Sequence, residues 1–65
     1  MNEINGKRYI NIQELSQLLR IKIKTLYGWV EAKSIPFYKF GALIRFDPEE
    51  IETWIKQHKI IPLTA

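Results

Sequence analysis

The sequence predicts a small, mainly α-helical domain in which two short helices and a tight turn are followed by a β-hairpin and a third helix. Apolar residues recur every three or four positions in two stretches separated only by residues 20–22, the pattern of two amphipathic helices joined by a turn. A glycine then interrupts a stretch of alternating aromatic residues, which is typical of a hairpin. Asp47-Pro48 opens a third periodic stretch and reads as a helix start.

Length and composition leave room for one domain over residues 1–65, with a core over residues 9–58 and a tail over 59–65. A chain of 65 residues buries only about 60% of its unfolded surface, so we expect marginal stability. The absence of cysteine excludes disulfides and thiolate metal sites. No apolar run approaches the ~20 residues of a membrane span, and residues 1–8 lack the apolar stretch of a signal peptide. We therefore expect a cytoplasmic protein.

The first helix is expected to begin at Asn11 and to end near Arg20. Asn11 can accept from a first-turn amide while Glu14 reaches back to the Asn11 backbone, which is a capping box. The apolar positions of this helix are Ile12, Leu15, Leu18 and Leu19. Before it, residues 1–8 are polar and are expected to be loose, with a turn at Asn5-Gly6. Tyr9-Ile10 is expected to form a short extended segment that packs on the core.

The second helix is expected over residues 23–33, after a connector in which Ile21 is buried. At 100° per residue its apolar side carries Ile23, Leu26, Val30 and the stem of Lys33, with Tyr27 and Trp29 at the margins. The opposite side carries Lys24, Gly28, Glu31 and Ala32, with Thr25 nearby. A helix with one face buried in the core and few large side chains on its exposed face suits insertion into a groove.

Proline at position 36 ends this helix, because it cannot continue one and pushes the preceding residue into an extended conformation. Strands are expected over residues 37–40 and 43–46, joined by a turn at Gly41-Ala42. Alternation would place one set of side chains toward the helices: Tyr38, Phe40, Ile44 and Phe46. Lys39 and Arg45 would then share the outer face, although another turn type would shift the register by one residue.

The third helix is expected to begin at Asp47 as N-cap, with Pro48 in the first position and Glu50 at the capping-box position. Its core face is predicted to carry Ile51, Trp54, Ile55 and His58. The two tryptophans are expected to pack in the core rather than stack on bases. The apolar tail from Ile60 onward is expected either to pack back on the domain or to mediate self-association.

The charge is unevenly distributed along the chain, whose net charge is +3. Six cations stand between Arg20 and Arg45 against the single acid Glu31, whereas four acids follow between residues 47 and 52. One part of the surface should therefore attract a polyanion while another part repels it.

Four motifs at their mutual spacing carry a resemblance to a known family. They are residues 9–15, the run Thr25-Leu26-Tyr27-Gly28-Trp29-Val30, residues 35–41 with Ile44-Arg45-Phe46, and residues 47–55. Together they resemble the excisionase-type, MerR-like winged helix-turn-helix domains of bacteria and their mobile elements, over residues 9–58. The resemblance implies a winged helix-turn-helix fold and non-catalytic, sequence-preferring binding of double-stranded DNA. The implied role is that of a recombination directionality factor or a small transcriptional regulator, associated with the nucleoid when bound.

The resemblance also implies partners and contact sites. The partners would be double-stranded DNA, an integrase or recombinase, and copies of the protein on adjacent sites, with no cofactor. In such proteins the second helix enters a major groove, and the hairpin is a wing along the backbone or in the adjacent minor groove. Groove-facing positions correspond to Lys24, Thr25 and Gly28, and positions that meet phosphates or frame the wing correspond to Tyr27, Lys39 and Arg45.

The chain departs from the family pattern in ways that change the expected contacts. Lys22 stands where serine is common, Gly28 where a long polar residue is common, and Lys33 where glycine is common. Ala42 replaces a frequent cation at the wing tip. The remaining cations are therefore expected to make most of the DNA contacts. Glu31 can accept a hydrogen bond from a cytosine amine. The candidate DNA-binding residues are Lys22, Lys24, Thr25, Tyr27, Gly28, Glu31, Lys33, Lys39 and Arg45.

An enzyme and a protein-interaction module are the two alternatives to DNA binding. The single histidine, His58, has no partner set for a zinc site or a triad, and the acids from Glu49 to Glu52 are explained by the helix dipole. With no nucleophile motif and no glycine-rich phosphate cradle, we expect no enzyme activity. A protein-interaction module that keeps the fold without DNA readout stays open, because Gly28, Ala42 and the apolar tail all favour it.

Overall fold

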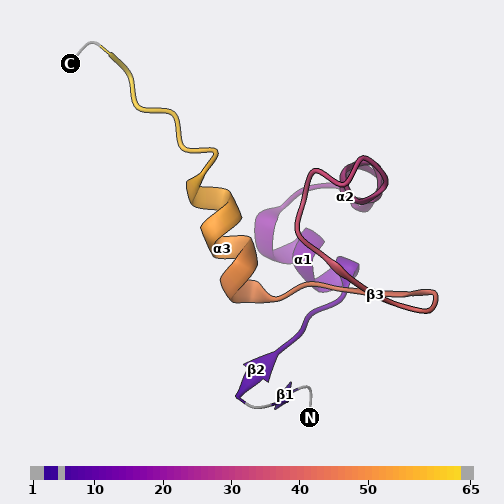
Figure 1. Cartoon of the computed structure of the whole chain (residues 1–65). Helices are drawn as coiled ribbons and strands as arrows, with labels where there is room; N and C mark the ends of the chain where they lie inside the picture. Colours follow the sequence, from indigo (N-terminus) through magenta and orange to yellow (C-terminus); the bar gives the residue numbers. More distant parts are fainter. Residues whose placement is uncertain (1–2, 5, 64–65) are drawn as a thin grey trace.

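The computed structural model describes residues 3–4 and 6–63 and has the predicted order of elements from the first helix onward (Figure 1). Its helices and strands are β1 Glu3–Ile4, β2 Lys7–Arg8, α1 Ile12–Leu19, α2 Ile23–Glu31, β3 Tyr38–Phe40, β4 Leu43–Arg45 and α3 Pro48–Lys56. The helix-turn-helix of α1 and α2, the β3–β4 wing and α3 make a winged helix-turn-helix, so the predicted fold class is confirmed. None of the helices in the described part of the chain is long and apolar enough to cross a membrane.

One apolar core joins the three helices and the extended segments between them. Its buried members are Ile10, Ile12, Leu15, Leu26, Val30, Ile35, Phe46 and Ile51. Phe46 is fully buried, and its backbone exchanges two hydrogen bonds with Ile10, at N···O distances of 2.9 and 2.8 Å. These bonds fasten the segment before α1 to the end of the wing, which confirms that Ile10 is extended and packs on the core.

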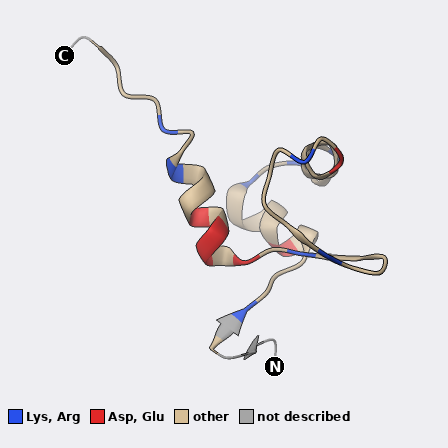
Figure 2. Cartoon of the chain, viewed as in Figure 1, with Lys and Arg blue, Asp and Glu red and all other residues tan. Residues whose placement is uncertain are grey.

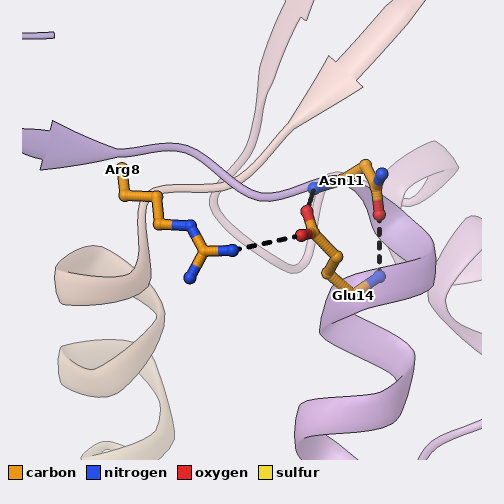
Figure 3. A network of polar contacts seen from close by, with 3 residues as sticks. All are labelled: Arg8, Asn11 and Glu14. Carbon is orange, nitrogen blue, oxygen red and sulfur yellow. Dashed lines mark hydrogen bonds and ion pairs between the residues drawn. The ribbon is translucent and has the colours of Figure 1, made fainter. Parts of the chain in front are cut away.

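The capping box predicted at the start of α1 is confirmed. The backbone amide of Glu14 donates to Asn11 Oδ1 at 2.7 Å, and the Asn11 amide donates to Glu14 Oε1 at 2.9 Å (Figure 3). Arg8 Nη2 lies 3.5 Å from the other Glu14 carboxylate oxygen. Leu18, predicted to face the core, is 64% exposed, because it lies about 90° around the helix from the buried face of Ile12 and Leu15.

The segment before α1 is more ordered than the sequence predicted. Residues 1–8 were expected to be loose, but β1 pairs antiparallel with β2, with Glu3 opposite Arg8 and Ile4 opposite Lys7. Gly6 takes a left-handed backbone conformation at the turn, with φ of 80°. Asn5, the other residue of the predicted turn, lies outside the described residues.

Each helix of the helix-turn-helix is followed by a cation with a left-handed backbone: Arg20, at φ 57°, directly after α1, and Lys33, at φ 56°, two residues after α2. After α2, the Ser34 amide donates to the Trp29 carbonyl at 2.9 Å and the Lys33 amide to the Val30 carbonyl at 3.0 Å. This pair of bonds is the Schellman arrangement, whose left-handed position favours glycine. The geometry ends α2 at Glu31, two residues earlier than predicted.

The wing has a different side-chain register from the one predicted. Tyr38 pairs with Arg45, Lys39 with Ile44, and Phe40 with Leu43. Gly41 at φ 61° opens a two-residue turn, which makes Phe40 and Leu43 direct neighbours across the strands. Prediction had placed Lys39 and Arg45 together on the outer face, and this is wrong, because cross-strand pairs share a face.

Helix α3 begins with the predicted N-cap Asp47 and Pro48 in its first turn, and it is anchored to both other parts of the domain. Asp47 is buried and accepts from the Glu49 amide at 3.0 Å. The Glu50 carboxylate accepts from the Tyr38 hydroxyl at 2.9 Å, which ties the helix start to the wing. Trp54 Nε1 donates to the Ser34 carbonyl at 2.9 Å, and its ring lies 5.7 Å from that of Trp29. Both tryptophans pack against the core, as predicted.

The end of α3 departs from the predicted pattern. The helix ends at Lys56, so His58 lies beyond it, with its ring 4.5 Å from the Trp54 ring. Ile55, predicted to be in the core, is 40% exposed. Ile60 and Leu63 are 87% and 104% exposed, so within residues 60–63 the expectation that the tail packs back on the domain is wrong.

Candidate nucleic-acid interface

Helix α2 turns one side to the core and the other to solvent, as predicted. Leu26 is fully buried and Val30 is 7% exposed, so these two side chains fix the rotation of the helix about its axis. The solvent side then presents four exposed residues: Lys24, Thr25, Gly28 and Glu31. Ile23 was placed in the core by its spacing but is 37% exposed, because it lies at the first position of the helix, beside the turn rather than over the core.

The N-terminus of α2 is open to an anion. Lys22 is the N-cap residue, and no side chain caps the first-turn amides. Unpaired first-turn amides and the positive end of the helix dipole together favour a negatively charged group at such a position. The exposed ammonium groups of Lys22 and Lys24 stand on the same turn. The absence of the capping serine, noted from the sequence, thus leaves a cationic helix start.

The two wing cations do not form one surface. Lys39 is exposed on the face that carries Ile44, whereas Arg45 is half-buried on the face that carries Tyr38. Arg45 Nη1 donates to the Ile44 carbonyl at 2.8 Å, so part of the guanidinium is held against the strand. The wing tip is apolar, with Phe40 and Leu43 each 57% exposed. Phe40 was predicted to be in the core, and its exposure follows from the register fixed by the two-residue turn.

The structure gathers most of the predicted site residues in one region. Seven of the nine lie on α2 or at its two ends, and two lie on the wing. Eight are exposed, and Arg45 is half-buried. The cations at the ends of α2 lie apart from the acids of α3, whereas the wing cations lie close to the acids at the start of that helix (Figure 2). Arg20 is exposed in the turn between α1 and α2 and belongs to the same cationic region. It is not among the nine predicted residues, although its position in the connector before α2 could have indicated it.

Gly28 lies in the middle of the solvent side of α2, and the fold gives no reason for a glycine there. A Cβ atom built at this position meets nothing within 4 Å. The Gly28→Ala variant is therefore expected to be more stable by about 1 kcal/mol, because alanine is the better helix former. The measurement is the free energy of unfolding in urea. Gly41→Ala is the control: it also has open space, but the φ of 61° makes it destabilising, and a loss of stability in Gly28→Ala would contradict the helix geometry.

Metal binding has no candidate cluster in the described part of the chain. Within residues 3–4 and 6–63, no group of three histidine, cysteine, aspartate or glutamate side chains is placed to hold an ion.

Comparison with protein-family models identifies a match over most of the chain. A protein-family model described as a helix-turn-helix domain matches residues 9–59. This span begins at the extended segment before α1 and ends just after α3, so it includes the helix-turn-helix, the wing and the third helix. No curated protein and no solved structure matches the chain.

Proposed function

Because the chain belongs to the helix-turn-helix domain family, we propose that it binds double-stranded DNA, with α2 in the major groove and the β3–β4 wing beside it. The observation that carries this proposal is the solvent side of α2, which is cationic at its start and free of bulky side chains at Gly28. An α-helix with its side chains is about 10–12 Å across, which matches a major groove about 12 Å wide. Leu26 and Val30 hold the helix from behind.

Affinity would come mainly from phosphate contacts. The ammonium groups of Lys22, Lys24, Lys33 and Lys39 are exposed and would displace counterions from the backbone. The uncapped amides at the start of α2 add donors for a phosphate oxygen. Tyr27, 48% exposed at the margin of the helix, can donate its hydroxyl to a neighbouring phosphate.

Base readout would rest on few side chains. Thr25 and Glu31 are exposed on the same helix, where a threonine methyl can contact a thymine methyl and a carboxylate can accept from a cytosine amine. Between them Gly28 has no side chain, so it would let the helix backbone approach the duplex closely. The interface would therefore depend more on the backbone than on bases, with a modest preference for sequence.

The finer role that fits such an interface is that of an excisionase-like recombination directionality factor or a small transcriptional regulator, acting without catalysis. A single module of this kind covers only about 600–1,000 Å². Useful specificity would then require neighbouring copies on adjacent sites or a partner such as an integrase or recombinase. The resemblance of the wing and helix motifs to excisionase-type domains supports this role.

The test uses a duplex recovered by selection from a random pool, with binding followed by fluorescence anisotropy. Lys24→Ala is expected to weaken binding and to make the log–log salt slope shallower by about 1, because its exposed ammonium group at the start of α2 would contact a phosphate. Lys56→Ala removes the same charge from the last turn of α3 and is expected to bind like the parent. Equal losses in both variants would make net charge, not the α2 face, responsible. No binding of any duplex at micromolar protein and low salt would favour an interaction module instead.

A further inference from the structure

An open groove runs between α3 and the segment that leads into the wing. One wall is formed by Pro36, Phe37 and Tyr38, and the other by Thr53, Trp54 and Gln57. Its volume is about 710 Å³, and it is an open surface depression rather than an enclosed cavity. None of the α2 residues assigned to DNA lines it. The groove is thus a second surface that the proposed DNA binding leaves unused.

The same chain carries an unpartnered apolar segment. Ile60, Ile61 and Leu63 are 87%, 72% and 104% exposed, and we call residues 60–63 the apolar tail. Pro62 excludes helix and favours an extended backbone for the residue before it. The tail leaves the end of α3 and points away from the rest of the domain (Figure 1). Three large aliphatic side chains exposed to water in one short run are unfavourable unless something covers them.

We propose that the groove binds the apolar tail of a second copy of this chain. Aromatic-lined grooves recognise extended segments that contain proline, because such segments lose little conformational entropy on binding. The groove supplies three aromatic side chains, Phe37, Tyr38 and Trp54, and the tail supplies Pro62 between large aliphatic residues.

Charge complementarity supports the same pairing. Glu49 and Glu50 line the groove and are exposed, and Glu50 also holds the Tyr38 hydroxyl at 2.9 Å. Lys59 directly precedes the apolar tail and is exposed. The acidic residues at the edge of the groove would pair with Lys59 while the aromatic residues contact the aliphatic tail. This pairing of charges would fix the direction in which the segment binds.

A second copy fits this pairing better than the chain's own tail. Gln57 lines the groove at its α3 end, and the tail leaves the domain beyond that point, directed outward (Figure 1). Its own tail would have to reverse direction within two or three residues, whereas a neighbouring copy can enter without such a turn. Tail and groove are different surfaces of the chain, so the contact either repeats from copy to copy as a head-to-tail series or closes when two copies exchange tails.

The absence of cysteine from the chain allows a direct test by disulfide trapping without DNA. Thr53→Cys places a thiol in the groove and Leu63→Cys places one on the tail of a second, isotope-labelled population. Mixing the two full-length chains under mild oxidation is expected to give a heterodimer several-fold faster than mixing Glu52→Cys with Leu63→Cys. Glu52 is exposed on α3 but does not line the groove. Equal rates in the two mixtures would overturn the proposal.

A second measurement separates a neighbour's tail from the chain's own. A synthetic peptide of residues 56–63 is titrated into the full chain while tryptophan fluorescence is recorded, because Trp54 lines the groove. A saturable change is expected, and a peptide with Ile61→Ser and Leu63→Ser should produce none. Identical responses to both peptides would contradict the pairing. A chain that carries both Thr53→Cys and Leu63→Cys gives a further check, because a disulfide that forms only within one such chain would also contradict it. Since no DNA is present, failure here leaves the proposed DNA binding untouched.

Discussion

Phe46→Ala is expected to destabilise the fold by about 3–5 kcal/mol, a large part of its total stability. Phe46 is fully buried in the core, and truncating a buried phenylalanine costs about 3–5 kcal/mol. At about 0.05–0.15 kcal/mol per residue, a domain of this length has only ~3–10 kcal/mol of stability. Phe46 also joins the N-terminal segment to the end of the wing through its bridge with Ile10, so removing its side chain weakens the packing at this junction. A small domain has no second core to compensate for this.

Far-UV circular dichroism and urea unfolding provide the measurement. Leu43→Ala is the matched control, because Leu43 belongs to the same hairpin but is 57% exposed. Its stability is expected to stay within about 0.5 kcal/mol of the parent. A cooperative unfolding transition for Phe46→Ala within about 1 kcal/mol of the parent would show that the core is not organised around this residue.

The features predicted correctly from the sequence are those decided by neighbouring residues. The capping box joins Asn11 and Glu14, three positions apart, and Asp47 caps an amide two positions away. Such bonds need only the local backbone, so residue type and spacing are enough to predict them. The solvent side of α2 followed in the same way from helical periodicity, and with it the grouping of Lys24, Gly28 and Glu31.

The features predicted wrongly depend on contacts between distant residues or on one backbone angle. The wing register follows from the φ of Gly41, and a shift of one residue turns every side chain of a strand to the other face. Lys39 and Arg45 were therefore wrongly placed on a common face. Leu18 has an apolar side chain at a plausible spacing, yet it is 64% exposed, because it lies away from the side of α1 that carries Ile12 and Leu15. Periodicity alone does not say how wide a buried face will be.

The wing register also bears on the electrostatics of DNA binding. With Lys39 and Arg45 on opposite faces, both can reach phosphates only if the wing lies edge-on to the backbone. If the four exposed lysines of α2 and the wing and the half-buried Arg45 each meet a phosphate, there would be about five phosphate contacts, for which the log–log dependence of affinity on salt has a slope near −4.5. Raising the salt from about 50 to 200 mM is thus expected to weaken binding roughly 500-fold.

The double variant Lys39→Ala with Arg45→Ala tests whether the wing contributes two of these contacts. Its slope is expected to be shallower by about 2, with affinity lowered for all sequences alike, because phosphate contacts carry no base information. Lys56→Ala with Lys59→Ala removes the same charge from the end of α3 and beyond, and it should keep the parent slope. Anisotropy titrations at four salt concentrations measure all three slopes. An equal change in both double variants would assign the salt dependence to net charge, and an affinity that does not change with salt would rule out the electrostatic mechanism altogether.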